Sequence, residues 1–81
     1  MAISAYVLIE CGMDPADAMR DLRKLSGVKQ AHALFGPLDA IAYVEGDDLE
    51  ALGEVIAHFY SVEGVKGSDT RIARVEELSG A

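Results

Sequence analysis

Cysteine is almost absent from this 81-residue chain, which has one, Cys11, and no tryptophan. A single cysteine forms neither an intramolecular disulfide nor a cysteine-rich metal site, which argues against a disulfide-stabilised secreted scaffold and a zinc module. The two histidines, His32 and His58, are scattered along the chain and do not form an H-x-x-x-H pair. We therefore predict no metal, no cofactor, and a buried, inert thiol at Cys11.

Long apolar runs and basic residues are also scarce. No run approaches the roughly 18 residues of a membrane span, and the N-terminus lacks the basic segment of a signal peptide, which predicts a cytoplasmic location. Seven basic residues against fourteen acidic ones give a net charge of -7, which repels a phosphate backbone, so we expect no direct binding of nucleic acid. The basic cluster Arg20, Arg23 and Lys24 lies beside Asp17 and Asp21, where ion pairs on a solvated helix face are expected.

Hydrophobic residues, by contrast, are plentiful and make up 51% of the chain. A domain this short builds one core and buries only about 60 to 65% of the surface of its unfolded chain. The excess of apolar residues therefore predicts a single domain, residues 1–81, that buries part of its surface against another copy of itself.

Two tripeptides recur at one spacing. Ala-Tyr-Val occurs at residues 5–7 and 42–44, and Gly-Val-Lys at residues 27–29 and 64–66, so both repeat at an offset of 37 residues. A common offset for two independent matches predicts two copies of a strand–helix–glycine–strand unit.

The first copy opens with alternating residues from Ile3 to Cys11, typical of a strand with apolar side chains on both faces. Asp14 and Pro15 predict the start of a helix, because aspartate caps free N–H groups and proline has the φ of the first helical position. Gly27 ends this helix, and residues 28–35 form the second strand. The buried stripe of the helix is predicted to be Ala18, Leu22 and Leu25.

The second copy follows the same plan after a Gly-Pro turn. Residues 38–45 form the third strand, Asp47 and Glu50 have the spacing of a capping box, Gly64 ends the second helix, and residues 70–75 form the last strand. The inward stripe of this helix is predicted to be Leu49, Leu52, Ile56 and Phe59.

The order β-α-β-β-α-β predicts the ferredoxin-like α+β fold, with a four-stranded antiparallel sheet and two helices on one face. Residues 76–81 are expected to form a frayed tail. The other sheet face is left uncovered and carries Tyr6 and Leu8. We expect two copies to meet through this face and form a dimeric α+β barrel.

The segment FGPLDAIAYV, with Gly36 and Asp39 between the second and third strands, resembles the G-x-x-D hairpin of the effector-binding domain of Lrp/AsnC-type transcription regulators. The opening AYVLIEC, the Gly-Val pair after each helix, and GVKGSDTRIA, with Ser68 and Thr70 at two hydroxyl positions, are similar as well. The resemblance extends from residue 3 to residue 75. It implies a stand-alone amino-acid-sensing domain without the N-terminal helix-turn-helix of its relatives.

The resemblance also implies how such a domain works: it dimerises through its sheets, the dimers form a ring, and a free amino acid binds where dimers meet. Mixed assembly with full-length Lrp/AsnC regulators would then modulate transcription. An amino acid needs an acceptor for its ammonium, such as Asp39, and donors for its carboxylate. An ordinary hairpin in which Asp39 caps its own turn remains the alternative. The ligand-binding residues implied are Gly36, Pro37, Leu38, Asp39, Ser68 and Thr70.

Two rival functions share this fold. A small α+β barrel enzyme of monooxygenase or isomerase type would use His32 or His58 as an acid or base. Neither histidine has a partner at a defined spacing, and no nucleophile elbow, Walker loop or HExxH motif is present, so we expect no enzyme and no catalytic residue. A ligand-free assembly protein would differ only at the loop that contains Gly36 and Asp39.

Overall fold

The structure, a computed structural model, describes residues 2–35 and 38–74. The predicted Gly36 and Pro37 contacts and the predicted tail, residues 76–81, therefore lie outside the described residues. The six elements follow in the predicted order: β1 (Ile3–Cys11), α1 (Pro15–Leu22), β2 (Val28–Ala33), β3 (Ala40–Gly46), α2 (Leu49–Phe59) and β4 (Val65–Ile72).

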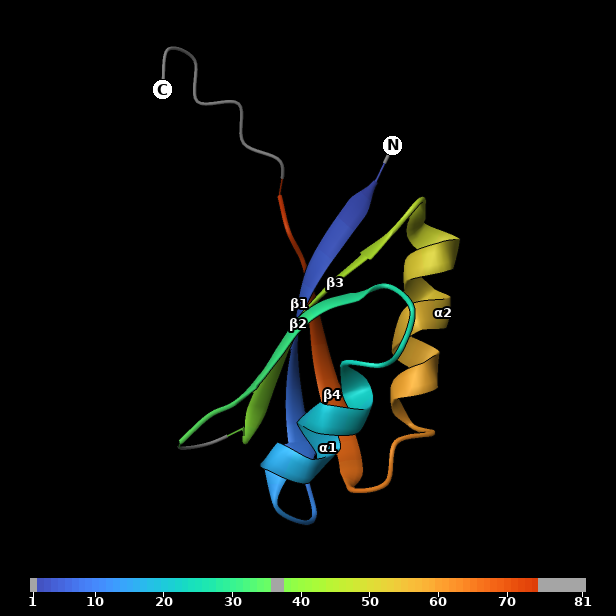
Figure 1. Ribbon diagram of the computed structural model, residues 1–81. Coiled ribbons are helices and arrows are strands. Elements are labelled where there is room, and N and C mark those ends of the chain that lie inside the picture. Colours follow the sequence, from blue (N-terminus) through green and yellow to red (C-terminus); the bar gives the residue numbers. More distant parts are fainter. Residues whose placement is uncertain (1, 36–37, 75–81) are drawn as a thin grey trace.

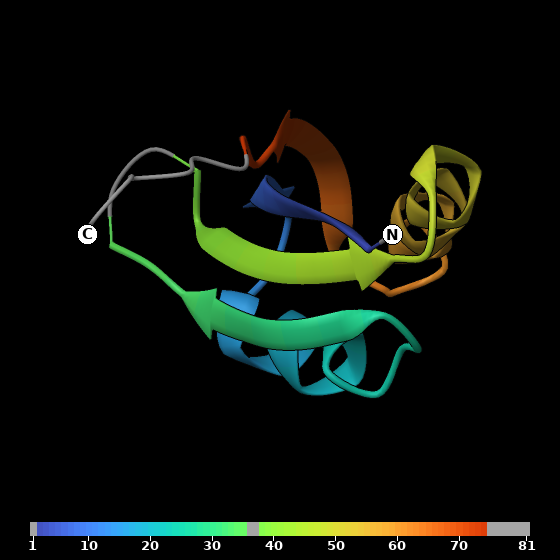
Figure 2. The ribbon, with the colours of Figure 1, turned by 90° about the horizontal axis from the view of Figure 1, so that it is seen from above.

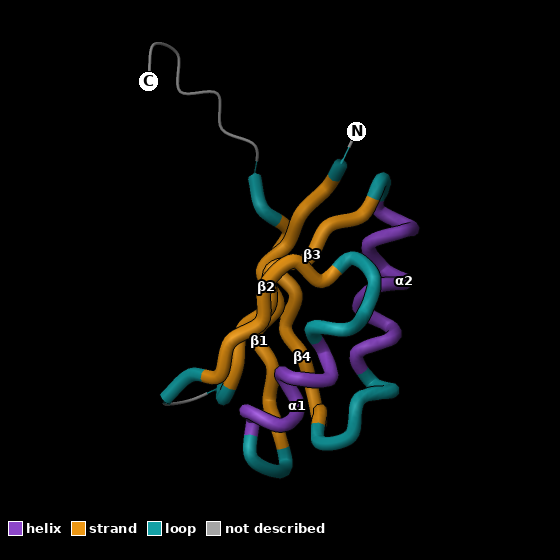
Figure 3. The backbone as a smooth tube through the Cα atoms, viewed as in Figure 1, coloured by secondary structure: helices purple, strands orange, loops and turns teal. Residues whose placement is uncertain are grey.

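The four strands form one antiparallel sheet in the order β2-β3-β1-β4. Both helices lie on the same side of this sheet (Figures 1, 2 and 3), with α1 packed mainly on β2 and α2 mainly on β3. This arrangement confirms the predicted ferredoxin-like α+β fold. No helix within the described residues is long and apolar enough to cross a membrane.

The core lies between the sheet and the helices. Alternate residues of β1 and β3 are fully buried on the helix side, because successive side chains of a strand point to opposite faces. The strand residues there are mostly small, and large helix side chains fill the space above them. The fully buried residues with the largest side chains are Phe59, Ile9, Met19, Leu22, Leu52, Val7 and Val44.

The two copies of Ala-Tyr-Val pair with each other at the centre of the sheet. Residues 5–7 of β1 run antiparallel to residues 42–44 of β3, with Tyr6 directly opposite Tyr43. Each repeated glycine has a positive φ, 91° at Gly27 and 98° at Gly64, a conformation that favours glycine. The predicted repeat is therefore a structural one, in which two similar halves pair around an approximate twofold axis near the two tyrosines.

The helix ends differ from the predicted ones in two places. Asp14 caps α1 as expected and accepts a hydrogen bond from the Ala16 N–H at 3.0 Å. The cap of α2 is Asp48 rather than Asp47, because Asp48 directly precedes the first helical residue and accepts from the Ala51 N–H at 2.8 Å. Helix α1 ends at Leu22, where the backbone tightens into i→i−3 hydrogen bonds, so the predicted stripe residue Leu25 lies in the following turn and is half-buried.

Three burial predictions are also corrected. Leu49, expected on the inward stripe, is 60% exposed because it occupies the first turn of α2, beyond the edge of the core. Cys11 is half-buried rather than buried, because it lies at the end of β1. Met19, which the expected stripe of α1 omitted, is fully buried.

The strand boundaries shift as well. Strand β4 begins at Val65, earlier than the expected residues 70–75, because its pairing with β1 runs from Cys11↔Val65 to Ala5↔Ile72. Its polar residues are compatible with an edge strand, which faces solvent along one side. Strand β2 stops at Ala33 instead of continuing through residue 35, because its pairing with β3 ends there.

Candidate functional site

The hairpin between β2 and β3 projects from one end of the sheet, away from α2 (Figure 1). The Leu34 N–H donates to the Asp39 carbonyl at 2.6 Å and closes the loop. Leu38 has a φ of 62°, a left-handed conformation that is uncommon for a leucine. Phe35 is fully exposed beside this turn. The hairpin thus presents an apolar side chain to solvent next to a constrained backbone.

Asp39 connects this hairpin to the end of β1. Its Oδ2 accepts a hydrogen bond from the Cys11 N–H at 3.0 Å, next to the point where the pairing of β1 with β4 shifts register. Burial, and to a smaller extent the Asp39 charge, raise the pKa of the Cys11 thiol. The Asp39 carboxylate is therefore held against β1, a strand that is distant in sequence. Among the described residues its Oδ1 receives no hydrogen bond.

The two predicted hydroxyl residues lie elsewhere in the protomer. Ser68 and Thr70 of β4 are opposite Ile9 and Val7, which belong to the core, so both face the helix side of the sheet. The Ser68 Oγ is 2.9 Å from the Tyr60 hydroxyl and forms a hydrogen bond with it. Because β1 separates β4 from β3, one copy of the chain does not bring these hydroxyls into contact with Asp39.

The histidines of the rival enzyme hypothesis lie on opposite sides of the molecule. His32 is on the uncovered sheet face opposite Ile41, whereas His58 is in the last turn of α2, and both are exposed. Within the described part of the chain, no group of three or more metal-binding side chains comes together. The structure therefore assembles no histidine-centred site from these residues.

The uncovered sheet face has an apolar centre. The Tyr6 and Tyr43 rings lie 5.1 Å apart at a tilt of 50°, and Leu8 lies directly opposite Ile41. Tyr6 is 49% exposed, and the other three side chains are partly exposed. The face thus leaves large apolar side chains in contact with water.

An ion pair that the sequence pattern did not indicate borders this centre. The Arg71 guanidinium lies 2.8 Å from the Asp69 carboxylate on β4, opposite Tyr6 and Leu8. The hydrogen bond from Arg71 lowers the pKa of the Asp69 carboxyl. A polar border around an apolar centre is the usual composition of a protein interface.

The family model of the Lrp/AsnC ligand-binding domain matches residues 4–76. The chain belongs to this family. The Lrp/AsnC domain thus accounts for nearly the whole sequence, and the predicted membership of this family is confirmed. The family consists of ligand-binding domains rather than enzymes, so small-molecule sensing is favoured over the enzyme hypothesis.

Solved structures with this fold include whole chains of similar length. TTHA0845 from Thermus thermophilus is 29% identical, with a TM-score of 0.83 over 95% of this chain and 99% of that one. A hypothetical protein from Pyrococcus horikoshii is 27% identical, with a TM-score of 0.79 over 94% and 93% of the two chains. No curated sequence matches this Lrp/AsnC domain.

A longer protein shares the fold as well. The transcriptional regulator NMB0573 from Neisseria meningitidis, solved as a complex with L-Met, is 20% identical, with a TM-score of 0.71. The match covers 95% of this chain and 52% of the regulator. At this identity the likeness shows the fold alone, which the regulator carries as about half of its length.

Proposed function

We propose that this Lrp/AsnC domain senses a free amino acid at the hairpin that contains Asp39. The observation that carries the proposal is the fixed Asp39 carboxylate: Oδ2 is held by the Cys11 N–H at 3.0 Å, and among the described residues Oδ1 has no hydrogen-bond donor. A carboxylate held in this way is oriented for an ammonium group before the ligand arrives, which lowers the entropic cost of binding. The L-Met complex of the Neisseria regulator supports the same class of ligand.

The ligand site, in this proposal, is completed by neighbouring copies of the chain. Asp39 and the pair Ser68 and Thr70 do not meet within one protomer, so a ligand that contacts all three needs groups from different copies. Phe35, fully exposed beside the hairpin, would be covered by such a contact. Dimers that meet at their hairpins would therefore enclose the amino acid and form a ring.

Dimerisation itself is proposed to use the uncovered sheet face. We expect Leu8→Glu to convert the dimer to a monomer at about 10 μM, because it places a charge at the apolar centre of this face. Leu49→Glu is the matched control: it makes the same change at an exposed position on the helix side, in the first turn of α2, where an acidic residue is favourable. Sedimentation velocity distinguishes the two, and a wild-type monomer would contradict the proposal.

Ligand binding is tested by Asp39→Asn. Asparagine keeps an oxygen that can accept from the Cys11 N–H but loses the charge that an ammonium needs, so affinity for the amino acid should fall about ten- to a hundredfold. Native mass spectrometry with a panel of free amino acids, L-Met included, identifies the ligand, and calorimetry on the variant measures the loss. Asp17→Asn on exposed α1 is the charge-matched control. Unchanged affinity in the Asn variant would remove Asp39 from the site.

Two further outcomes separate the alternatives. If no amino acid binds the wild type while the ring forms, the chain is an assembly protein without a ligand. With a net charge of -7, the chain alone should not shift duplex DNA, whereas a mixed oligomer with a full-length Lrp/AsnC regulator should alter that regulator's DNA binding. A salt-dependent shift by the isolated chain would contradict this role.

A further inference from the structure

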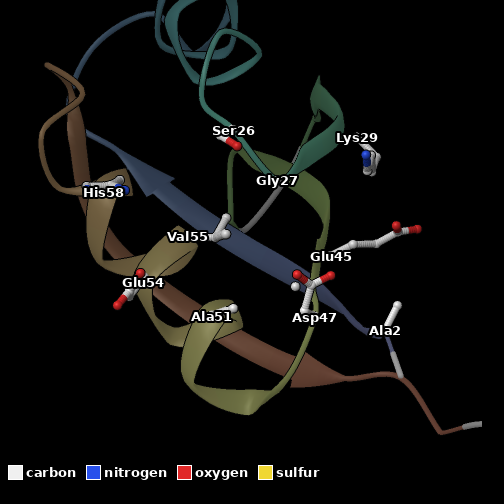
Figure 4. Close-up of a pocket in the computed structure, with 11 residues that line it drawn as sticks. Ala2, Ser26, Gly27, Lys29, Glu45, Asp47, Ala51, Glu54, Val55 and His58 are labelled. Atoms are coloured by element: carbon white, nitrogen blue, oxygen red, sulfur yellow. The ribbon is translucent and has the colours of Figure 1, made fainter.

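A groove of about 410 Å³ lies on the helix side of the molecule, between α2 and the segment that leads into β2. Its floor is apolar and consists of Ala51 and Val55 from α2 together with the backbone of Gly27 and Gly46. Figure 4 shows Val55 at the middle of the groove and the Asp47 carboxylate turned toward its interior. This volume lies within the range of small-molecule sites. The titratable side chains that line the groove are Lys29, Glu45, Asp47, Glu54 and His58.

The groove is distinct from the hairpin that contains Asp39. Asp39 immediately precedes β3 and Asp47 immediately follows it, so eight residue steps of extended strand, about 26 Å, separate the two backbone positions. The groove is also built within a single protomer and lies on the side opposite the sheet face proposed for dimerisation. Binding here therefore does not require assembly.

The other half of the molecule fills the equivalent place with its own side chains. A Cβ atom added at Gly64 would lie 2.5 Å from Met13 Cγ and 2.7 Å from its sulfur, and one added at Gly12 would lie 2.7 Å from Lys66 Cδ. The residue 37 positions after Met13 is Glu50, which is exposed on the first turn of α2. At Gly27 the corresponding close contact, 2.5 Å, is with Val55 of α2, so the groove lies beside Val55, whereas Met13 and Lys66 occupy the equivalent place in the other half.

The charges around the open groove favour a cation. The lining contains three carboxylates and one lysine, so these four groups together have a net charge of about -2. Among the residues that the structure describes, the ion pairs involve other side chains and none of these five. The carboxylates therefore remain available to a ligand, and the negative potential attracts positive charge.

We propose that this groove binds a primary ammonium group carried on a short aliphatic chain. The ammonium would lie against Asp47, and the alkyl chain would cover Ala51 and Val55. A diamine and an ω-amino acid share this chemistry. Lys29 distinguishes them, because its charge repels the second ammonium of a diamine and attracts the carboxylate of an amino acid.

The test is a titration of the 15N-labelled protein with 1,4-diaminobutane and, separately, with 4-aminobutanoate. Amide shifts should concentrate around Gly27, Gly46 and Val55, and Asp47→Asn should weaken binding about three- to tenfold, a range set by partial exposure of the charge. Asp47 is not the cap of α2, so the variant should keep its fold. Asp21→Asn, on the exposed surface of α1, is the matched control and should leave binding unchanged.

A steric variant gives an independent measurement. Ala51→Met should fill the groove, much as Met13 covers Gly64, and should weaken binding more than tenfold, whereas Ala57→Met on the exposed side of the same helix should not. Lys29→Met should strengthen binding of 1,4-diaminobutane and weaken binding of 4-aminobutanoate. The compound that binds the wild type more tightly shows whether the ammonium group belongs to a diamine or to an ω-amino acid.

Three results would overturn the proposal: binding of neither compound, equal weakening by Asp47→Asn and Asp21→Asn, or shifts confined to the hairpin around Asp39. The result of this test is distinguishable from the result for the proposed amino-acid site at Asp39. Leu8→Glu, which should disrupt the dimer, leaves a groove within one protomer intact, and Asp39→Asn should not affect it.

Discussion

The two halves of this molecule place the same contact at equivalent positions but make it with different chemistry. Arg23, at the C-terminal end of α1, donates through Nε and one terminal nitrogen to the Ala31 carbonyl at 2.9 and 2.6 Å. Residues 37 positions later, Tyr60 at the end of α2 and Ser68 on β4, form a hydroxyl–hydroxyl hydrogen bond of 2.9 Å. The backbone of the repeated unit thus determines where helix and strand are joined, and the side chains determine how.

The halves differ most where strand passes into helix. β1 has nine residues and α1 has eight, whereas β3 has seven and α2 has eleven. The first half therefore has a loop, which contains Met13, at the position where the second half has the first turn of α2. Met13 covers Gly64 from this loop, whereas the side chain that covers Gly27 is Val55 of α2, which lines the groove. A shift of about one helical turn is enough to leave a groove in one half and fill it in the other.

The largest effect is expected in the core, at the equivalent pair Phe59 and Leu22, both fully buried. Phe59→Ala should lower the free energy of unfolding by about 4 kcal/mol and Leu22→Ala by about 3 kcal/mol, because the larger side chain leaves the larger cavity. Urea denaturation measures both. A larger loss of unfolding free energy for Leu22→Ala than for Phe59→Ala would contradict this ranking of the two core positions.

The second-largest loss of stability is expected from alanine at the two positive-φ glycines, and it should differ between them. Alanine is strained at both, at a cost of about 1 to 2 kcal/mol. At Gly27 the new methyl group would also lie 2.5 Å from Val55 Cγ2 and 3.0 Å from the Glu45 carbonyl oxygen, whereas at Gly64 it meets the flexible Met13 side chain. Gly27→Ala should therefore lower the thermal midpoint more than Gly64→Ala, and equal midpoints would contradict this comparison.

The two helix caps should contribute about equally to the free energy of unfolding. Asp14→Ala and Asp48→Ala each remove one side-chain acceptor at a helix N-terminus, and each should cost about 1 kcal/mol of stability. The double variant should cost the sum, because the two caps share no partner. Asp47→Ala, one residue before the true cap, serves as the control and should change the free energy of unfolding little.

The smallest effects are expected at the equivalent helix–strand contacts. Arg23→Met keeps much of the alkyl chain but removes a charge-assisted bond to a strand carbonyl, and should cost about 1 kcal/mol. Tyr60→Phe removes a neutral bond between exposed hydroxyls and should cost less than about 0.5 kcal/mol. The difference is measurable by chemical denaturation, and a larger loss for Tyr60→Phe would reverse our ranking of the two contacts.

Most of the fold was predictable from sequence because its signals are local. Asp14 and Pro15 mark the start of α1, Gly27 and Gly64 mark the turns into β2 and β4, and alternation marks β1. Where a signal was ambiguous, as with adjacent aspartates before α2, the sequence favoured Asp47 and the structure uses Asp48. Two neighbouring residues of one type offer the same capping group, and only the backbone path selects between them.

The basic cluster at α1 shows that local sequence also does not determine every side-chain contact. Ion pairs form between Arg20 and Asp17 and between Lys24 and Asp21, each at a spacing of i,i+3, in line with the expected solvated helix face. Arg23, in the same cluster, instead reaches a carbonyl of β2. The acceptor is eight residues away, beyond the range over which helix periodicity is informative.

The sequence by itself determined the order of the six elements, the repeat of its two halves and the resemblance of the hairpin to the Lrp/AsnC family, because these depend on periodicity, caps and glycines within short windows. Tertiary structure alone decided what Asp39 contacts, since its hydrogen bond to the Cys11 N–H spans 28 residues and depends on β1 lying beside β3. It also decided that Ser68 and Thr70 face the helices and that a groove lies beside Val55 of α2. Strand register and the relative lengths of strand and helix determine these contacts and orientations, and no local sequence pattern encodes them.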